Sequence, residues 1–163
     1  MSKIQNSLGR TYFNPGSGID QTEKPFVLDN SRCYYIFDVI PVGAVRMSNR
    51  DRIFTNPNHT DPKKRQRPEV TRYFAFQNEL WAQAKAMGVT VPNKFEIVFL
   101  VPMPSSWSDK KKNKYNKMPC KTRPDIDNYL KAFMDTLKLE DGSVWACPPQ
   151  KIYAFNGSII LFV

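Results

Sequence analysis

Histidine and cysteine are scarce in this sequence, and their scarcity limits the chemistry that the chain can carry. Among 163 residues there is one histidine, His59, and there are three cysteines, Cys33, Cys120 and Cys147, with no CxxC pair. One histidine argues against a histidine-based catalytic triad and against a multi-histidine metal site. Three dispersed cysteines argue against a disulfide framework and a thiolate zinc site. If the chain is an enzyme, we expect its chemistry to rest on carboxylates.

Long apolar segments are also missing. No apolar run approaches the roughly 20 residues of a membrane-spanning helix, and the first residues lack the apolar core of a signal peptide. We therefore expect a cytoplasmic protein.

The chain has an excess of positive charge, because 24 Lys and Arg residues against 15 Asp and Glu residues give a formal net charge of +9. This excess predicts an anionic partner, with nucleic acid the first candidate and an anionic membrane surface the second.

The distribution of apolar residues predicts one domain preceded by an arm. Residues 1–30 are rich in Gly, Asn, Ser and Pro, which indicates an N-terminal arm ahead of a domain over residues 31–163. Hydrophobic residues make up 41% of the chain, enough for a core. The fold class we expect is α/β (α+β), a small mixed β-sheet with two main helices. The periodicities predict strands within 33–43, 94–103 and 142–163 and helices within 69–88 and 127–139.

Some local patterns are more specific. The predicted helix over 69–88 has a broad apolar stripe and a stop at Gly88, and Asn156-Gly157 is a strong turn signal between the last two strands. The prolines of ACPP, residues 146–149, cannot donate to a strand ladder, so this stretch is expected at a sheet edge or a break. The stripe comprises Val70, Tyr73, Phe74, Leu80, Trp81, Ala84 and Met87.

Two aspartates stand together at the start of the second predicted helix, in the stretch TRPDIDNYLKAFMDTL. Residues i and i+2 of an extended segment point the same way, so Asp125 and Asp127 are expected on one side. Carboxylates this close repel one another unless a cation lies between them. Mg²⁺ suits that place, because it binds one or two carboxylates, waters and substrate phosphates. Lys131, one helical turn after Asp127, could reach the same pocket and contact a phosphate or a developing oxyanion.

These acids also have a simpler interpretation. Aspartates before a helix are often N-caps and partners of the helix dipole, and the spacing alone favours neither interpretation. A third acid would strengthen the metal hypothesis, and Glu140 and Asp141 stand together in the turn after the helix. Asp-Gly is a common turn pair, so on local sequence alone a solvated turn is the favoured interpretation of this second acidic pair.

Basic residues gather in two long polar segments, 44–68 and 104–124, that we predict to be loops. The second segment leads directly to Asp125 and carries Trp107 and Tyr115 among its lysines. Phosphate neutralisation by such groups gives strong, salt-sensitive and sequence-independent binding. The hypothesis is that the bases attract a polyanion and that a metal held by the acids acts on its backbone; an RNA-binding protein would leave the acids unexplained. The residues expected to bind DNA are Arg46, Arg50, Arg52, Lys110, Lys111, Lys112, Lys114, Lys121 and Arg123.

Several stretches carry a family resemblance, namely IPVGAVRMSNRDR, KRQRPEVTRYFAFQNEL, PMPSSWSDKKK, RPDIDNYLKAFMDTL and EDGSVW. Over about residues 34 to 160, the chain resembles the RusA family of Holliday junction resolvases, particularly those encoded by bacteriophages and prophages. The resemblance implies a small homodimeric endonuclease that depends on Mg²⁺, with Mn²⁺ as a possible substitute. It implies paired nicks in a four-way DNA junction, a DNA partner and not a membrane, and a bacterial host cytoplasm if phage-encoded.

The resemblance also assigns site residues. The family's aspartate pair falls on Asp125 and Asp127, and its helix lysine falls on Lys131. Its last acidic pair falls on Glu140-Asp141, with Asp141 as the third metal ligand. Glu140 would bind metal, orient a ligand or act as a base.

A competing register exists for that last pair. The family pattern W-x-D-D-x-Q can be laid on WACPPQ, residues 145–150, which puts Cys147 and Pro148 in place of the acids. That register implies a degenerate module that binds branched DNA or a protein partner without cutting. We prefer the first register, because it keeps a carboxylate where metal chemistry needs one.

Overall fold

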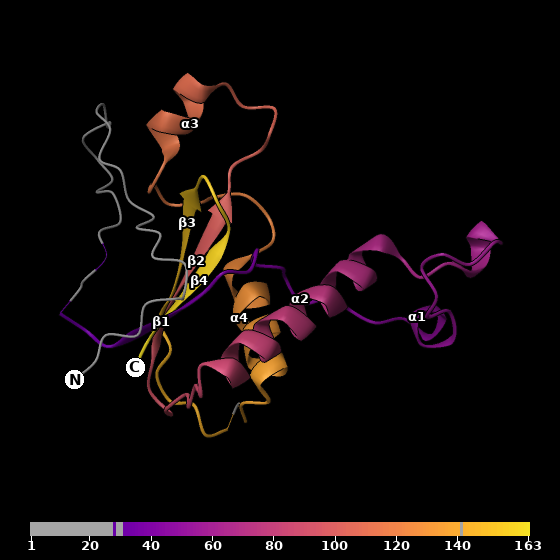
Figure 1. Cartoon of the computed structure of the whole chain (residues 1–163), viewed down its shortest axis with the longest axis horizontal. Coiled ribbons are helices and arrows are strands. Elements are labelled where there is room, and N and C mark those ends of the chain that lie inside the picture. Colours follow the sequence, from indigo (N-terminus) through magenta and orange to yellow (C-terminus); the bar gives the residue numbers. More distant parts are fainter. Residues whose placement is uncertain (1–27, 29–30, 141) are drawn as a thin grey trace.

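Four strands form one mixed sheet, and helices pack against it (Figure 1). This computed structural model describes residue 28, residues 31–140 and residues 142–163, so the predicted arm over 1–30 lies almost wholly outside the described residues. The arrangement is the α+β fold expected from the sequence. In chain order the elements are β1 (Tyr34–Phe37), α1 (Asn49–Ile53), the 3-10 helix η1 (Pro62–Lys64), α2 (Pro68–Ala86), β2 (Glu96–Pro102), α3 (Asp109–Tyr115), α4 (Ile126–Leu137), β3 (Pro149–Ala154) and β4 (Ser158–Phe162).

The strand order in the sheet is β1-β4-β2-β3. Strand β4 runs antiparallel to both β1 and β2, whereas β2 and β3 are parallel. The parallel pair needs a long crossover, and the chain between β2 and β3 supplies it with α3 and α4. Strand β3 is the outer strand beyond β2 and begins at Pro149, so the expectation of an edge position for ACPP is confirmed.

Helices α2 and α4 cover the same face of the sheet and contribute to one hydrophobic core (Figure 1). Phe133 of α4 is fully buried, with its ring centroid 6.1 Å from that of Phe37 and 6.2 Å from that of Phe95. Side chains of alternate strand residues pack in a second cluster, which includes Val98 and Ile160. The core therefore fixes α4, and with it the acidic stretch at its start, against the sheet.

The apolar stripe of α2 is narrower than the sequence suggests. Val70, Tyr73, Leu80 and Ala84 are buried as predicted, but Phe74 and Trp81 are 43% and 48% exposed. Phe76, which the predicted stripe omits, is buried instead. The buried positions follow spacings of three and four residues around one helical face, and Phe74 and Trp81 lie to the side of it.

Both segments that we predicted to be loops contain short helices. Ser48 caps α1 and forms a capping box with Asp51. Ser108 caps α3 through a hydrogen bond from the Lys111 amide, and the acidic Asp109 stands in the first turn. These are ordinary helix-start signals. They are easily missed in polar, basic sequence, because neither helix has the buried apolar stripe from which a helix is usually predicted.

Candidate active site

Asp125 and Asp127 lie at the start of α4. Asp125 is the N-cap residue, but its side chain makes no capping hydrogen bond, and Asp127 is the second residue of the helix. The expected extended i, i+2 arrangement is therefore wrong, because Asp127 is already helical. Both side chains are exposed, and neither has a hydrogen bond or an ion pair within the described part of the chain. The simple N-cap interpretation leaves Asp125 unexplained, and both carboxylates are available to bind a cation.

Asp125 borders an open hollow of about 530 Å³ between the start of α4 and edge strand β3. The space is large enough for a phosphate group with several waters, since one water occupies about 30 Å³ in the liquid. Asp127 is not among the residues that border it. The lining is formed by Pro119, Cys120, Asp125, Ile126, Pro149, Gln150, Lys151 and Ile152.

The lysine at this hollow is Lys151 of β3. Its ammonium group donates hydrogen bonds to the backbone carbonyls of Thr122 and Pro124, just before Asp125. Lys131, the lysine predicted for the site, does not border the hollow; its Nζ lies 3.9 Å from Asp135 Oδ1. That contact is the i,i+4 ion pair expected from the spacing of these two residues.

The start of α4 is held in place from two sides. The Ala44 amide donates to the Asn128 carbonyl at 2.9 Å, which lays segment 42–45 along the first turn of the helix. Tyr129 is buried and stacks on Phe99 of β2, with the ring centroids 5.4 Å apart. Burial raises the pKa of the Tyr129 hydroxyl to about 12, with a smaller contribution from Cys120. Asp125 therefore stands on a rigid support.

Glu140 lies beyond the opposite end of α4, where its carbonyl accepts hydrogen bonds from the Ser143 amide and hydroxyl. A helix of twelve residues separates it from Asp125, a length of about 18 Å at 1.5 Å per residue. The structure thus does not bring Glu140 and Asp125 together. Asp141 lies outside the described residues.

The segment that does reach Asp125 is the one containing WACPPQ. It runs beside the start of β2, where the Phe95 amide donates to the Ala146 carbonyl at 3.0 Å. It then enters β3, so that Gln150 borders the same hollow as Asp125. Gln150 and Lys151 are absent from the predicted site residues, although Lys151 matches a later basic position of the family in the preferred register. The final glutamine of the W-x-D-D-x-Q pattern was the available signal for Gln150.

Metal binding can be judged by the donors present. Among the described residues, which exclude Asp141, no group of three or more His, Cys, Asp or Glu side chains could hold a metal ion. Two carboxylates without partners stand at the start of α4. A hard cation such as Mg²⁺ can be held by one or two carboxylates with waters and phosphate oxygens completing its shell. Asp125 and Asp127 are therefore oxygen donors of the kind that such an ion accepts, with waters or other oxygens completing its shell.

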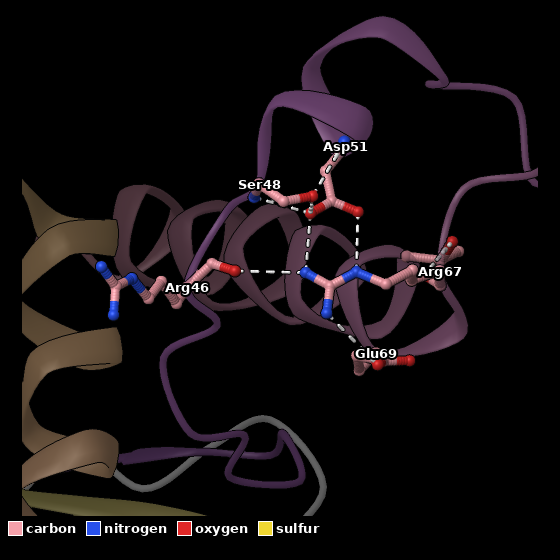
Figure 2. Close-up of polar contacts among 6 residues, drawn as sticks. Arg46, Ser48, Asp51, Arg67 and Glu69 are labelled. Atoms are coloured by element: carbon pink, nitrogen blue, oxygen red, sulfur yellow. Dashed lines mark hydrogen bonds and ion pairs between the residues drawn. The ribbon is translucent and has the colours of Figure 1, made fainter.

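A buried ion pair organises the first basic segment (Figure 2). The Asp51 side chain is 1% exposed and accepts two hydrogen bonds from the Arg67 guanidinium, at 2.8 and 2.6 Å. Arg67 Nη2 also donates to the Arg46 carbonyl at 3.1 Å. These bonds from Arg67, followed by those from Ser48, hold the pKa of Asp51 well below its usual range. Arg67, near the end of the basic segment 44–68, thus has a structural contact within this segment.

The predicted DNA-binding residues lie on the surface. The Arg46 guanidinium points away from Asp51 in Figure 2, and Arg50 and Arg52 are exposed on α1. Helix α3 projects from the end of the sheet (Figure 1), carrying most of the remaining lysines. The ammonium of Lys111 lies 3.9 Å from the ring centre of Trp107. The remaining residues of the set are Lys110, Lys112 and Lys114 on α3, and Lys121 and Arg123 in the turn before Asp125.

The chain was compared with models of known protein families. A family model described as "Endodeoxyribonuclease RusA" matches residues 42–146, which is more than half of the chain. The matched region includes Asp125 and Asp127 and ends before Gln150 and Lys151. No curated protein matches the chain. No helix in the described ranges combines the length and the apolar character that crossing a membrane requires.

Proposed function

The chain belongs to the RusA family of endodeoxyribonucleases, and on this basis we propose that it resolves Holliday junctions and other branched DNA by paired, Mg²⁺-dependent phosphodiester cleavage. The observation that carries the proposal is the carboxylate pair at the start of α4. Neither Asp125 nor Asp127 has a polar partner among the described residues, and Asp125 borders an open hollow beside Lys151. Unpaired carboxylates on a strongly basic chain suit a metal site that acts on a polyanion.

In this proposal Asp125 and Asp127 would hold Mg²⁺ or Mn²⁺. The family resemblance predicts Asp141 as a third ligand, but Asp141 directly follows Glu140, which lies beyond the far end of α4 from Asp125, so the two carboxylates at the start of α4 carry the proposal. When bound, the ion would activate a water molecule and stabilise negative charge on the phosphate. The start of α4 contributes amide groups and the positive end of the helix dipole, which favour a phosphate at this place. Lys131, one turn after Asp127, would offset charge on the phosphate or the leaving oxygen. Because Glu140 lies beyond the far end of α4, the proposal does not use it as a ligand beside Asp125.

The basic segments would bind the DNA. Arg46, Arg50 and Arg52 on one side and the lysines of α3 on the other would neutralise phosphates and give salt-sensitive affinity. A homodimer would present two identical sites related by a two-fold axis, which suits paired nicks in opposing strands. The place of action that we propose is the cytoplasm, that of a bacterial host if the chain is phage-encoded.

A second candidate function has its own supporting observation. The segment WACPPQ brings Gln150 to the hollow that Asp125 borders. In the competing register, this segment has Cys147 and Pro148 at the positions of the family's last acidic pair. Glu140 cannot replace that pair, because α4 separates it from Asp125. A site with two carboxylates in place of three would favour a module that binds branched DNA or a protein partner without cutting it.

Cleavage of a labelled synthetic four-way junction, with and without Mg²⁺ and beside a linear duplex, tests both functions. For the nuclease we expect paired symmetric nicks that need Mg²⁺. Asp125→Asn should lower the cleavage rate at least about 100-fold while junction binding is kept, because the variant loses a carboxylate ligand of the ion that would stabilise negative charge on the phosphate. Asp38→Asn, which changes an exposed aspartate after β1, is the matched control.

The opposite results are equally informative. Full cleavage by Asp125→Asn would refute the assignment of the site. Tight, salt-sensitive junction binding by the unmodified protein, with no nicks in either Mg²⁺ or Mn²⁺, would establish the binding module instead.

A further inference from the structure

Lys151 lies in the part of β3 that is covered by the chain segment leading to α4. The Cys120 amide donates to the Lys151 carbonyl at 2.8 Å, and the Lys117 amide donates to the Tyr153 carbonyl at the same distance. The Tyr153 amide returns a hydrogen bond to Met118 at 2.9 Å. Segment 117–120 thus pairs with the free side of the edge strand, and its backbone position is fixed relative to β3.

The side chain of Lys151 extends this attachment toward the acids. Beyond Cys120 the segment leaves β3, and the Lys151 ammonium then donates to the carbonyls of Thr122 and Pro124, the latter at 2.8 Å. Pro124 is directly followed by Asp125, the first residue of the site. The lysine therefore ties the turn that carries Asp125 to the strand that forms the other side of the hollow.

The charge of Lys151 is not neutralised by these contacts. An ammonium group has three N–H donors, and the two carbonyls occupy two of them. No carboxylate lies within ion-pair distance of Lys151 in the described part of the chain, although Asp125 borders the same hollow. The side chain is half-buried, so solvent screens its charge less than that of a surface lysine. A positive charge with a remaining donor thus stands beside a carboxylate at an open space.

Lys131 differs in each of these respects. Its side chain is 63% exposed and its ammonium group is shared with Asp135. A flexible, paired and exposed lysine must lose more conformational freedom to hold a phosphate than one already held by two backbone carbonyls. Of the two lysines, Lys151 is the better prepared to receive an anionic oxygen in the hollow.

We propose that Lys151 is a phosphate-binding residue of this site. Two of its N–H groups hold the turn before Asp125, and the third donates to a non-bridging oxygen of a DNA phosphate in the hollow. The inference rests on the proposed action on DNA, because it assigns the anion to a DNA backbone. It adds a binding residue from β3, beyond the region that the family model matches.

The test measures junction affinity against salt concentration with Mg²⁺ replaced by EDTA, so that cleavage cannot interfere. Removing one phosphate contact should reduce the slope of log K against log salt by about 1. We expect this reduction for Lys151→Met, whereas Lys151→Arg keeps the charge and should keep the slope. Lys138→Met, at an exposed position after α4, is the control and should leave the slope unchanged.

Cleavage supplies a second readout. In single-turnover assays at saturating protein, Lys151→Met should cleave at least about 10-fold more slowly than the unmodified protein, because the turn before Asp125 loses its support. A folded Lys151→Met protein with the unmodified slope would overturn the inference, whatever its cleavage rate. If Lys151→Met fails to fold, a folded Lys151→Arg protein decides, because a lower slope for it would also overturn the inference.

The outcome for Lys151 is separable from that for the nuclease. If the unmodified protein binds junctions but never cuts them, the proposed cleavage is wrong, and the slope still decides whether Lys151 contacts phosphate. If the protein cuts junctions and the slope does not change, only the inference about Lys151 is wrong. Absence of DNA binding by the unmodified protein would overturn both.

Discussion

Gly43 and Pro124 are in contact, although they are far apart in the sequence. A β-carbon placed on Gly43 would lie 2.8 Å from the Pro124 β-carbon and 3.0 Å from its γ-carbon. The segment that contains Gly43 also bonds to the first turn of α4 through Ala44 and Asn128. Glycine at position 43 therefore lets two chain segments meet directly behind Asp125.

Gly43→Ala should disturb the proposed site more than the same substitution at a surface glycine would. The proline ring is rigid and cannot turn aside, so the added methyl group must displace the residue that precedes Asp125. We expect a lower melting temperature and a junction cleavage rate reduced at least about 10-fold, since small displacements at a reacting centre are costly. Gly142→Ala is the control, because nothing lies within 4 Å of the added atom. Equal effects of the two substitutions would contradict the role of the Gly43–Pro124 contact.

Asp51→Asn should destabilise the first basic segment, because the substitution leaves the Arg67 guanidinium without its buried counter-ion. The pKa of Asp51 is lowered in the folded protein, so its stabilising effect is complete above the unfolded pKa of about 4 and is lost as the pH falls below that value. Melting temperatures measured between pH 7 and pH 2 should therefore fall more steeply for the unmodified protein than for Asp51→Asn. Parallel curves would show that the ion pair contributes nothing. Asp38→Asn serves again as the control and should keep the steeper dependence.

Phe133→Ala should lower the free energy of unfolding by about 3 to 5 kcal/mol, the usual cost of removing a buried aromatic ring. Phe133 is fully buried between α4 and the sheet, whereas Phe155 is 51% exposed. Urea denaturation of Phe133→Ala and of the matched Phe155→Ala protein measures the difference. A loss below about 1 kcal/mol at Phe133 would mean that α4 does not depend on this packing.

The lysines of α3 can be tested as a group. Replacing Lys110, Lys112 and Lys114 by alanine should weaken junction binding and reduce the salt slope by about two to three, at roughly 0.9 per phosphate contact. The comparison is a protein in which three other lysines become alanine, namely Lys85, Lys94 and Lys138. If both triple variants lose the same affinity, general charge and not the projecting helix attracts the DNA.

Much of the fold could be predicted from local patterns. The apolar stretch at 94–103 became β2, and the periodicity over 127–139 predicted α4 correctly. The prolines Pro148 and Pro149 predicted a sheet edge or a break, because proline has no N–H to donate to a ladder, and β3 is an edge strand. These features depend on residues close together in the chain, and periodicity reports such relationships directly.

The site was less predictable. The sequence placed Asp125 and Asp127 at a helix start, but it did not reveal that the Asp125 side chain leaves the helix amides uncapped. The separation of Glu140 from Asp125 follows from the length of α4, once the helix is known to run unbroken between them. On α2, Phe74 and Phe76 are both aromatic, and packing against the sheet decided that Phe76 is the buried one.

The sequence by itself determined the positive charge, the shortage of histidine, the strand and helix segments and the acidic pair, because each is a property of composition or of neighbours in the chain. Only the tertiary structure decided that Lys151 supports the turn before Asp125 and that Gln150 borders the same hollow. Those relationships depend on the position of β3 beside β2 and on the pairing of segment 117–120 with its outer side. Contacts between segments distant in the chain follow from how the whole sheet assembles, and no local pattern encodes them.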